Sequence, residues 1–222
     1  MKLFRSRWLL GTVLSAGLMV ALTIDAFACA CCADEGEYTY SPNARISDYQ
    51  RAQFDGMKFG PAARLYLTDA GEDAVKGLAS ITPENTVSVV IEPKLWRLTF
   101  RSADGKTGIL TLAIPAKITT LAADLHDSED LRLGPSLYKE WRCEGVAKGD
   151  GIFQKGFAAP ARYTLIFQGR GNRCDSGSDF THWRVEISGA KASYAFFGEL
   201  LSDAAPDESA TPSPSGDAKP KE

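Results

Sequence analysis

Three cysteines lie close together near the start of the chain, at Cys29, Cys31 and Cys32. Thiolates at such spacing can bind a soft ion such as copper or zinc, and they can also carry out thiol–disulfide exchange. The spacing is not the C-x-x-C of thioredoxin-like enzymes. Two other roles are open: Cys31 and Cys32 can fix the N-terminus through disulfides, and Cys29 can carry a lipid anchor. The candidate metal ligands are therefore Cys29, Cys31 and Cys32.

Two further cysteines, Cys143 and Cys174, flank a turn-rich stretch, and each lies close to a predicted strand. In an oxidising compartment, paired cysteines usually form disulfides. We therefore expect a structural disulfide between Cys143 and Cys174, which on the chain-entropy account stabilises the fold by about 3–4 kcal/mol.

The segment 168–183 is rich in glycine and polar residues, a composition typical of functional loops. It holds the candidate catalytic residues Asp175, Asp179 and His182, whose carboxylates and imidazole are suited to acid–base chemistry. Asp175 also begins an Asp-Ser-Gly sequence like that of aspartic proteases, but the sequence has no second copy, which favours a turn. His182 is more typical of a hydrogen-bonded structural histidine than of a general base or a ligand. The sequence contains no G-x-S-x-G nucleophile elbow and no phosphate-binding glycine loop.

The first 28 residues have the three parts of a cleavable secretory signal. Lys2, Arg5 and Arg7 are basic, Leu9 to Ile24 is uncharged, and Ala26-Phe27-Ala28 has the small-x-small pattern of a cleavage site. The apolar run is shorter than the roughly 20 residues of a membrane span. We expect a periplasmic or secreted protein without a transmembrane span after cleavage, or, if Cys29 is lipidated, one anchored to the envelope.

The charge of the chain argues against nucleic acid as a partner. Its formal net charge is −3, and removal of the basic signal leaves the mature chain more acidic. An acidic protein repels phosphate backbones. A small ligand or an envelope partner remains compatible with the composition.

From residue 87 onward, apolar and polar residues alternate as they do in half-buried strands. Trp96, Leu98 and Phe100 alternate with basic or polar residues, and the runs at 163–168 and 183–188 do the same. Trp-Arg pairs at 96–97, 141–142 and 183–184 fit the same in–out pattern better than a repeat. The pattern predicts a mainly β fold, either an antiparallel β-sandwich or a partly open barrel.

Before residue 80 we expect one or two short helices. Ser47 and Gln50 have the spacing of a capping box, and Asp69 to Leu78 is a second helical candidate. Residues 202–222 contain prolines but no aromatic or large aliphatic residue, which predicts a disordered tail. The chain thus divides into a signal at 1–28, a Cys-rich segment at 29–45, a β-rich globular domain at 46–201 and the tail at 202–222.

Three functions fit the sequence. The first is an exported, non-catalytic β domain that binds a small ligand, a metal or a partner. The second is a hydrolase-like enzyme with a site near Asp175, Asp179 and His182. The third is thiol-based metal or redox handling by the N-terminal cysteines. A deep pocket that holds His182 beside carboxylates would favour the enzyme, whereas a packed interior would favour the binding domain.

Overall fold

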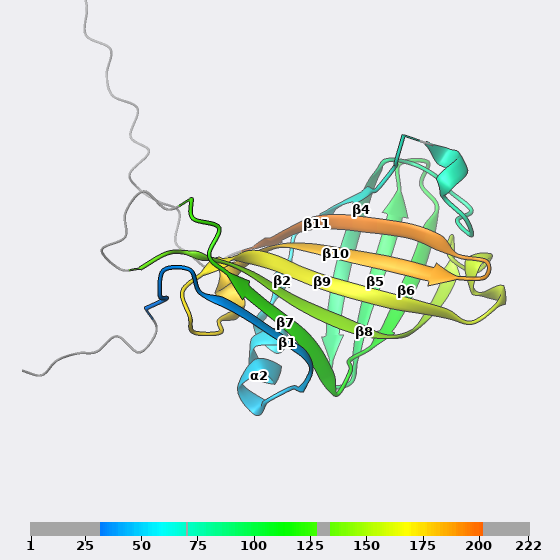
Figure 1. Ribbon diagram of the computed structural model, residues 1–222. Coiled ribbons are helices and arrows are strands. Elements are labelled where there is room, and N and C mark those ends of the chain that lie inside the picture. Colours follow the sequence, from blue (N-terminus) through cyan, green and yellow to red (C-terminus); the bar gives the residue numbers. More distant parts are fainter. Residues whose placement is uncertain (1–31, 70, 128–133, 202–222) are drawn as a thin grey trace, which may run out of the picture. The chain divides into compact units, whose positions relative to one another are not determined.

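A computed structural model describes residues 32–69, 71–127 and 134–201 (Figure 1). The predicted signal, the predicted tail and the cysteines Cys29 and Cys31 lie outside these residues. The strands are β1 (Tyr38–Arg45), β2 (Lys58–Phe59), β3 (Ala62–Leu65), β4 (Glu84–Glu92), β5 (Leu95–Ser102), β6 (Thr107–Ala113), β7 (Lys117–Ala123), β8 (Leu137–Gly151), β9 (Ala161–Gly171), β10 (Phe180–Gly189) and β11 (Ser193–Leu201). The helical elements are the α-helix α2 (Asp48–Gly56) and the 3-10 helices η2 (Glu72–Ala74), η3 (Gly156–Ala158) and η4 (Gly177–Asp179).

The expected mainly β fold with antiparallel pairing is confirmed. Strand pairing runs β8-β6-β5-β4-β3-β11-β10-β9 and returns from β9 to β8, so that eight strands form a closed ring. Figure 1 shows β8, β9, β10 and β11 lying side by side along one part of this ring. β2 adds to β11 outside the ring.

The ring closes because β8 is long. It has 15 residues, and its first part (138–142) pairs with β7 while its last part (147–151) pairs with β6 along the same edge. Its other edge pairs with β9 over 137–147. β7 and β1 therefore extend from the ring as an added hairpin, and β1, which falls in the Cys-rich segment of the sequence analysis, belongs to the sheet.

The predicted in–out alternation is confirmed at the three Trp-Arg pairs of β5, β8 and β10, where each Trp is buried and each Arg is more exposed. Trp96, Trp141 and Trp183 are all buried, and they belong to one cluster of aromatic and aliphatic side chains inside the ring. Most pairs of aromatic rings in this cluster pack edge-on or tilted, with their centroids 4.6–6.4 Å apart. These separations are typical of favourable aromatic contacts. Aromatic side chains thus fill the interior.

One α-helix, α2, covers part of this cluster. Its start follows the predicted capping box, in which the Ser47 and Gln50 side chains each accept a hydrogen bond from the other's backbone N–H. The buried Phe54 ring lies 5.6 Å from Trp96 and 5.1 Å from Trp141. In the described residues of the second helical candidate, 69 and 71–78, the helical part is the short η2, and Gly71 adopts a positive φ of 59° immediately before it.

None of the helices in the described ranges combines the length and the apolar character that crossing a membrane requires. The predicted tail begins directly after Leu201, the last residue of β11.

Candidate functional site

Asp175 and Asp179, two of the predicted catalytic residues, lie on either side of one buried cation. Lys139 Nζ is 2.7 Å from Asp179 Oδ2 and 3.8 Å from Asp175 Oδ1, and the Lys139 side chain is 1% exposed. Its ammonium group also donates a hydrogen bond to the backbone carbonyl of Cys174. The geometry therefore assigns both carboxylates to the neutralisation of a buried charge.

The position of Lys139 follows from the alternation along β8. Leu137, Trp141 and Cys143 share its face of the strand, and all are buried. A buried ammonium group is costly unless charged and polar partners surround it. The loop at 172–179, which connects β9 to β10, provides those partners, so this ionic contact holds the loop against β8.

The close approach of this loop requires a glycine at the end of β9. A Cβ atom on Gly171 would lie only 2.2 Å from Asp179 Cγ, well inside contact distance. The missing side chain leaves the space in which the Asp179 carboxylate reaches Lys139. Gly171 is thus a positioning residue for the ion pair.

Two glutamines of α2 fix the other side of the loop. Gln50 Nε2 donates to Asp175 Oδ2 at 3.3 Å, while Gln53 Oε1 accepts from the Gly177 backbone N–H at 2.7 Å. Gln50 Oε1 also accepts from Ser47 N as part of the capping box. The same glutamine therefore caps the helix and joins it to the loop.

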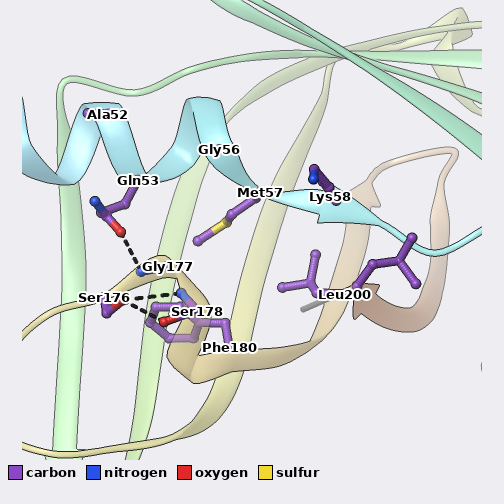
Figure 2. Close-up of a pocket in the computed structure, with 11 residues that line it drawn as sticks. Ala52, Gln53, Gly56, Met57, Lys58, Ser176, Gly177, Ser178, Phe180 and Leu200 are labelled. Atoms are coloured by element: carbon purple, nitrogen blue, oxygen red, sulfur yellow. Dashed lines mark hydrogen bonds between the residues drawn. The ribbon is translucent and has the colours of Figure 1, made fainter. Parts of the chain in front are cut away.

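A groove of about 240 Å³ lies between α2 and η4, and we call it the α2–η4 groove (Figure 2). It is both polar and apolar: Figure 2 shows Gln53 bonded to Gly177 at one side, and the Met57, Phe180 and Leu200 side chains at the other. Its further lining residues include Ala52, Gly56, Lys58, Ser176, Ser178 and Leu201.

Two exposed apolar residues lie on the elements that form the groove. Tyr49 stands on α2 one turn before Gln53, on the same face of the helix, and is 56% exposed. Leu201, at the end of β11, is 55% exposed. Leu201 also lines the groove, so its lining includes an exposed apolar side chain.

The third predicted catalytic residue, His182, lies elsewhere. Its side chain is exposed on β10, and its Nδ1 is 2.8 Å from Thr181 Oγ1. It lines a separate depression with Pro61, Ala62 and Phe197. A register shift between Phe180 and His182 separates the start of β10 from the regular pairing that follows. The described geometry brings Asp175 and Asp179 together and does not bring His182 to them.

The predicted disulfide between Cys143 and Cys174 is wrong. Cys143 is a free, fully buried thiol on the inner face of β8, opposite Leu165 on β9. The carbonyl of Cys174 instead contacts Lys139, four residues before Cys143, and four residues of strand span roughly 13 Å. Burial raises the pKa of the Cys143 thiol far above its usual value, which keeps it protonated and unreactive.

Of the predicted metal ligands, Cys29 and Cys31 lie outside the described residues, and Cys32 is partly exposed. Within the described ranges, His, Cys, Asp and Glu side chains form no group of three or more that could hold a metal ion. The described part of the chain thus offers a groove rather than a metal centre.

Sequence reasoning singled out Asp175 and Asp179 but missed the two elements that position them. Lys139 was visible as a polar residue at an apolar position of an alternating run, between Leu137 and Trp141. The contribution of α2 was not visible, because helix and loop are more than 120 residues apart in the sequence.

The chain matches no protein-family model, no curated protein and no solved structure. The geometry of the described residues is therefore the basis for a functional proposal.

Proposed function

We propose that this chain is an exported, non-catalytic β domain that binds a polypeptide partner of the envelope at the α2–η4 groove. The observation that carries the proposal is the groove itself, whose lining combines hydrogen-bonding groups with apolar side chains, among them the exposed Leu201. Within this proposal the closed ring is a barrel rather than a sandwich, since its strand pairing continues without a break from β8 back to β8.

The packed interior favours binding on the outside of the domain. Small-molecule sites are usually hollows lined with apolar side chains. Here Trp96, Phe100, Phe153 and Phe167 are fully buried in one cluster, and they occupy the space that such a hollow would need.

The environment of the candidate catalytic residues also favours binding over catalysis. A general base needs a carboxylate or imidazole that can reach the substrate. Asp179 is committed to Lys139, and Asp175 accepts a hydrogen bond from Gln50 while facing the same cation. These contacts make the loop rigid, and rigidity favours affinity because less motion is lost on binding.

The groove suits a polypeptide partner in particular. An apolar side chain of the partner can contact Met57, Phe180 and Leu200, while its backbone can exchange hydrogen bonds with the Ser176 and Ser178 hydroxyls. Tyrosine residues are enriched at protein interfaces, and the exposed Tyr49 lies on α2 one turn before Gln53, which lines the groove. The domain needs no conformational change to present these groups.

Photo-cross-linking in intact cells tests the proposal. A photoreactive phenylalanine analogue replaces Tyr49 or Leu201 in the exported full-length chain, and a matched control replaces Val90 on β4, which is 55% exposed. We expect the same protein adduct from positions 49 and 201 and none from position 90. Equal adducts at all three positions, or none at 49 and 201, would contradict a binding groove.

A further inference from the structure

The outer edge of β1 is open in the described sheet. Of the described strands, β1 and the two-residue β2 pair with a single neighbour. The neighbour of β1 is β7, which in turn pairs with β8 (Figure 1). The unpaired edge of a strand carries backbone N–H and C=O groups with which another chain can pair. The outer edge of β1 is therefore a template for one further strand.

Backbone groups along β1 point alternately to β7 and to this open edge. The Glu37 carbonyl accepts a hydrogen bond from the Asp124 N–H at 2.8 Å, so these opposite residues form a hydrogen-bonded pair. Since hydrogen-bonded and non-hydrogen-bonded pairs alternate along an antiparallel ladder, Thr39 also directs its backbone groups to β7. The N–H and C=O groups of Tyr38 and Tyr40 therefore point to the open edge.

The side chains of the same segment favour pairing with a second copy. Tyr38 and Tyr40 lie on one face of β1 and are 69% and 56% exposed. Open edges are often protected by charged side chains, but residues 38–41 carry no charge, so two copies of this segment do not repel each other. Pro42 and the register shift after Ser41 protect the rest of the strand. The part of β1 that can pair is thus short, uncharged and aromatic.

We infer that β1 pairs with β1 of a second copy of this chain, antiparallel and about a two-fold axis at Thr39. In this register Tyr38 of each copy lies opposite Tyr40 of the other. Each such pair exchanges both of its backbone N–H···O=C hydrogen bonds. The rings of opposite tyrosines lie on the same face of the joined sheet and contact each other across the strands.

The residues at the two ends of this segment select that register. A shift that places Tyr38 opposite Pro42 would set the Tyr38 carbonyl against a residue that has no N–H. A shift in the other direction would set the Tyr40 carbonyl against Gly36, whose N–H already donates to Asp124 Oδ2 at 2.9 Å. With Tyr38 opposite Tyr40, each N–H and C=O that these residues direct to the open edge has a partner.

The size of the contact predicts a weak dimer. A short ladder and the tyrosine rings keep the contact below the roughly 1,200–2,000 Å² that stable interfaces bury. Because the same edge is used on both copies, the contact closes at a dimer and does not extend into fibres. The pairing involves none of the residues that line the α2–η4 groove, so its failure would leave the proposed function untouched.

Sedimentation equilibrium of the full chain purified after export, from about 10 μM to about 1 mM, tests the inference. We expect a monomer–dimer equilibrium for the wild type. Tyr40→Pro removes the outward N–H, and proline is tolerated on an edge where the N–H would face solvent, so the pairing of Thr39 with β7 is kept. Its dimer Kd should be weaker by about tenfold or more.

Tyr40→Phe is the matched control, because it keeps both the ring and the backbone N–H, and its dimer Kd should equal that of the wild type. A wild type that stays monomeric over the whole concentration range would overturn the inference. So would a dimer whose Kd is the same in Tyr40→Pro, because it would form through another surface.

Photo-cross-linking decides the matter if Tyr40→Pro fails to fold. A photoreactive phenylalanine analogue at position 38 keeps the backbone and an aromatic ring, and in the inferred dimer it lies opposite Tyr40 of the second copy. Irradiation should give a covalent dimer in amounts that rise with protein concentration. The same analogue at the exposed Val90 on β4 should give none. No covalent dimer from position 38, or equal amounts from both positions, would refute pairing through β1.

Discussion

Lys139 Nζ and Asp179 Oδ2 lie 2.7 Å apart and join the inside of β8 to η4. Among the described residues, a few polar side chains are buried, such as Asn85 and Ser102, and Lys139 is the one buried side chain that carries a charge. The pair therefore fixes the loop at 172–179, and with it the wall of the α2–η4 groove.

Replacement of Asp179 by Asn should strongly destabilise the fold. It leaves the buried Lys139 ammonium without its nearest counter-ion, and breaking a buried pair in this way costs about 3–5 kcal/mol. Urea unfolding followed by tryptophan fluorescence measures the loss. The control is Glu84→Gln, which removes an ion pair with Arg64 whose side chains are both about two-thirds exposed, and such pairs contribute less than about 1 kcal/mol. Equal losses in the two variants would show that the buried pair has no special role.

Gly171→Ala should act on the same pair without changing a charge. The added methyl group would lie 2.2 Å from Asp179 Cγ, so the loop must move, at a cost of about 1–3 kcal/mol. Gly56→Ala is the matched control, because a Cβ atom there meets nothing within 4 Å. Differential scanning calorimetry should show a lower melting temperature for the first variant and little change for the second. A melting temperature that falls only in the control would refute the packing argument.

Stability should fall as the pH rises above 9. Burial raises the pKa of the Cys143 thiol in the folded state above its usual value of 9.0, so the unfolded chain releases this proton first. The contribution of this thiol to the free energy of unfolding is fully present below pH 9. As the pH rises from 9 toward the pKa of the folded state, this contribution falls by about 1.4 kcal/mol per pH unit.

Unfolding free energies at pH 9 and pH 10 measure this effect in the wild type and in Cys143→Ala. The variant should lose less stability over this interval. Tyr163 and Tyr194 are present in both proteins, and burial raises their pKa values too, with the Cys143 charge adding to the rise at Tyr163, so they contribute mainly above pH 10. If the free energy of unfolding falls equally between pH 9 and pH 10 in the two proteins, the Cys143 thiol does not titrate as its burial requires.

The strands could be predicted where one face is buried and the other is polar. Trp96 and Trp183 are each followed by a basic residue, and this local alternation predicts which side chains of the strand are buried. The closure of the ring could not be predicted, because it depends on β8 changing partner from β7 to β6 along one edge. The sequence of residues 138–151 does not indicate which strands pair with β8.

The candidate site was predictable only in part, for a similar reason. Asp175 and Asp179 stand out locally in a loop of small polar residues. Their partners Lys139 and Gln50 come from distant parts of the chain, and long-range pairing decides such contacts. The Cys143–Cys174 prediction was wrong because proximity to a strand says nothing of the face to which a cysteine points, and Cys143 points into the core.

The most direct test of the proposed function is the affinity of the cross-linked partner for a protein whose groove is filled. Ser178 lines the groove and is exposed, so Ser178→Trp places a large ring there without entering the core. Val90→Trp, on the exposed face of β4, is the control. Isothermal titration should show the Kd at least tenfold weaker for Ser178→Trp and unchanged for Val90→Trp. An unchanged Kd for Ser178→Trp would contradict binding at the α2–η4 groove.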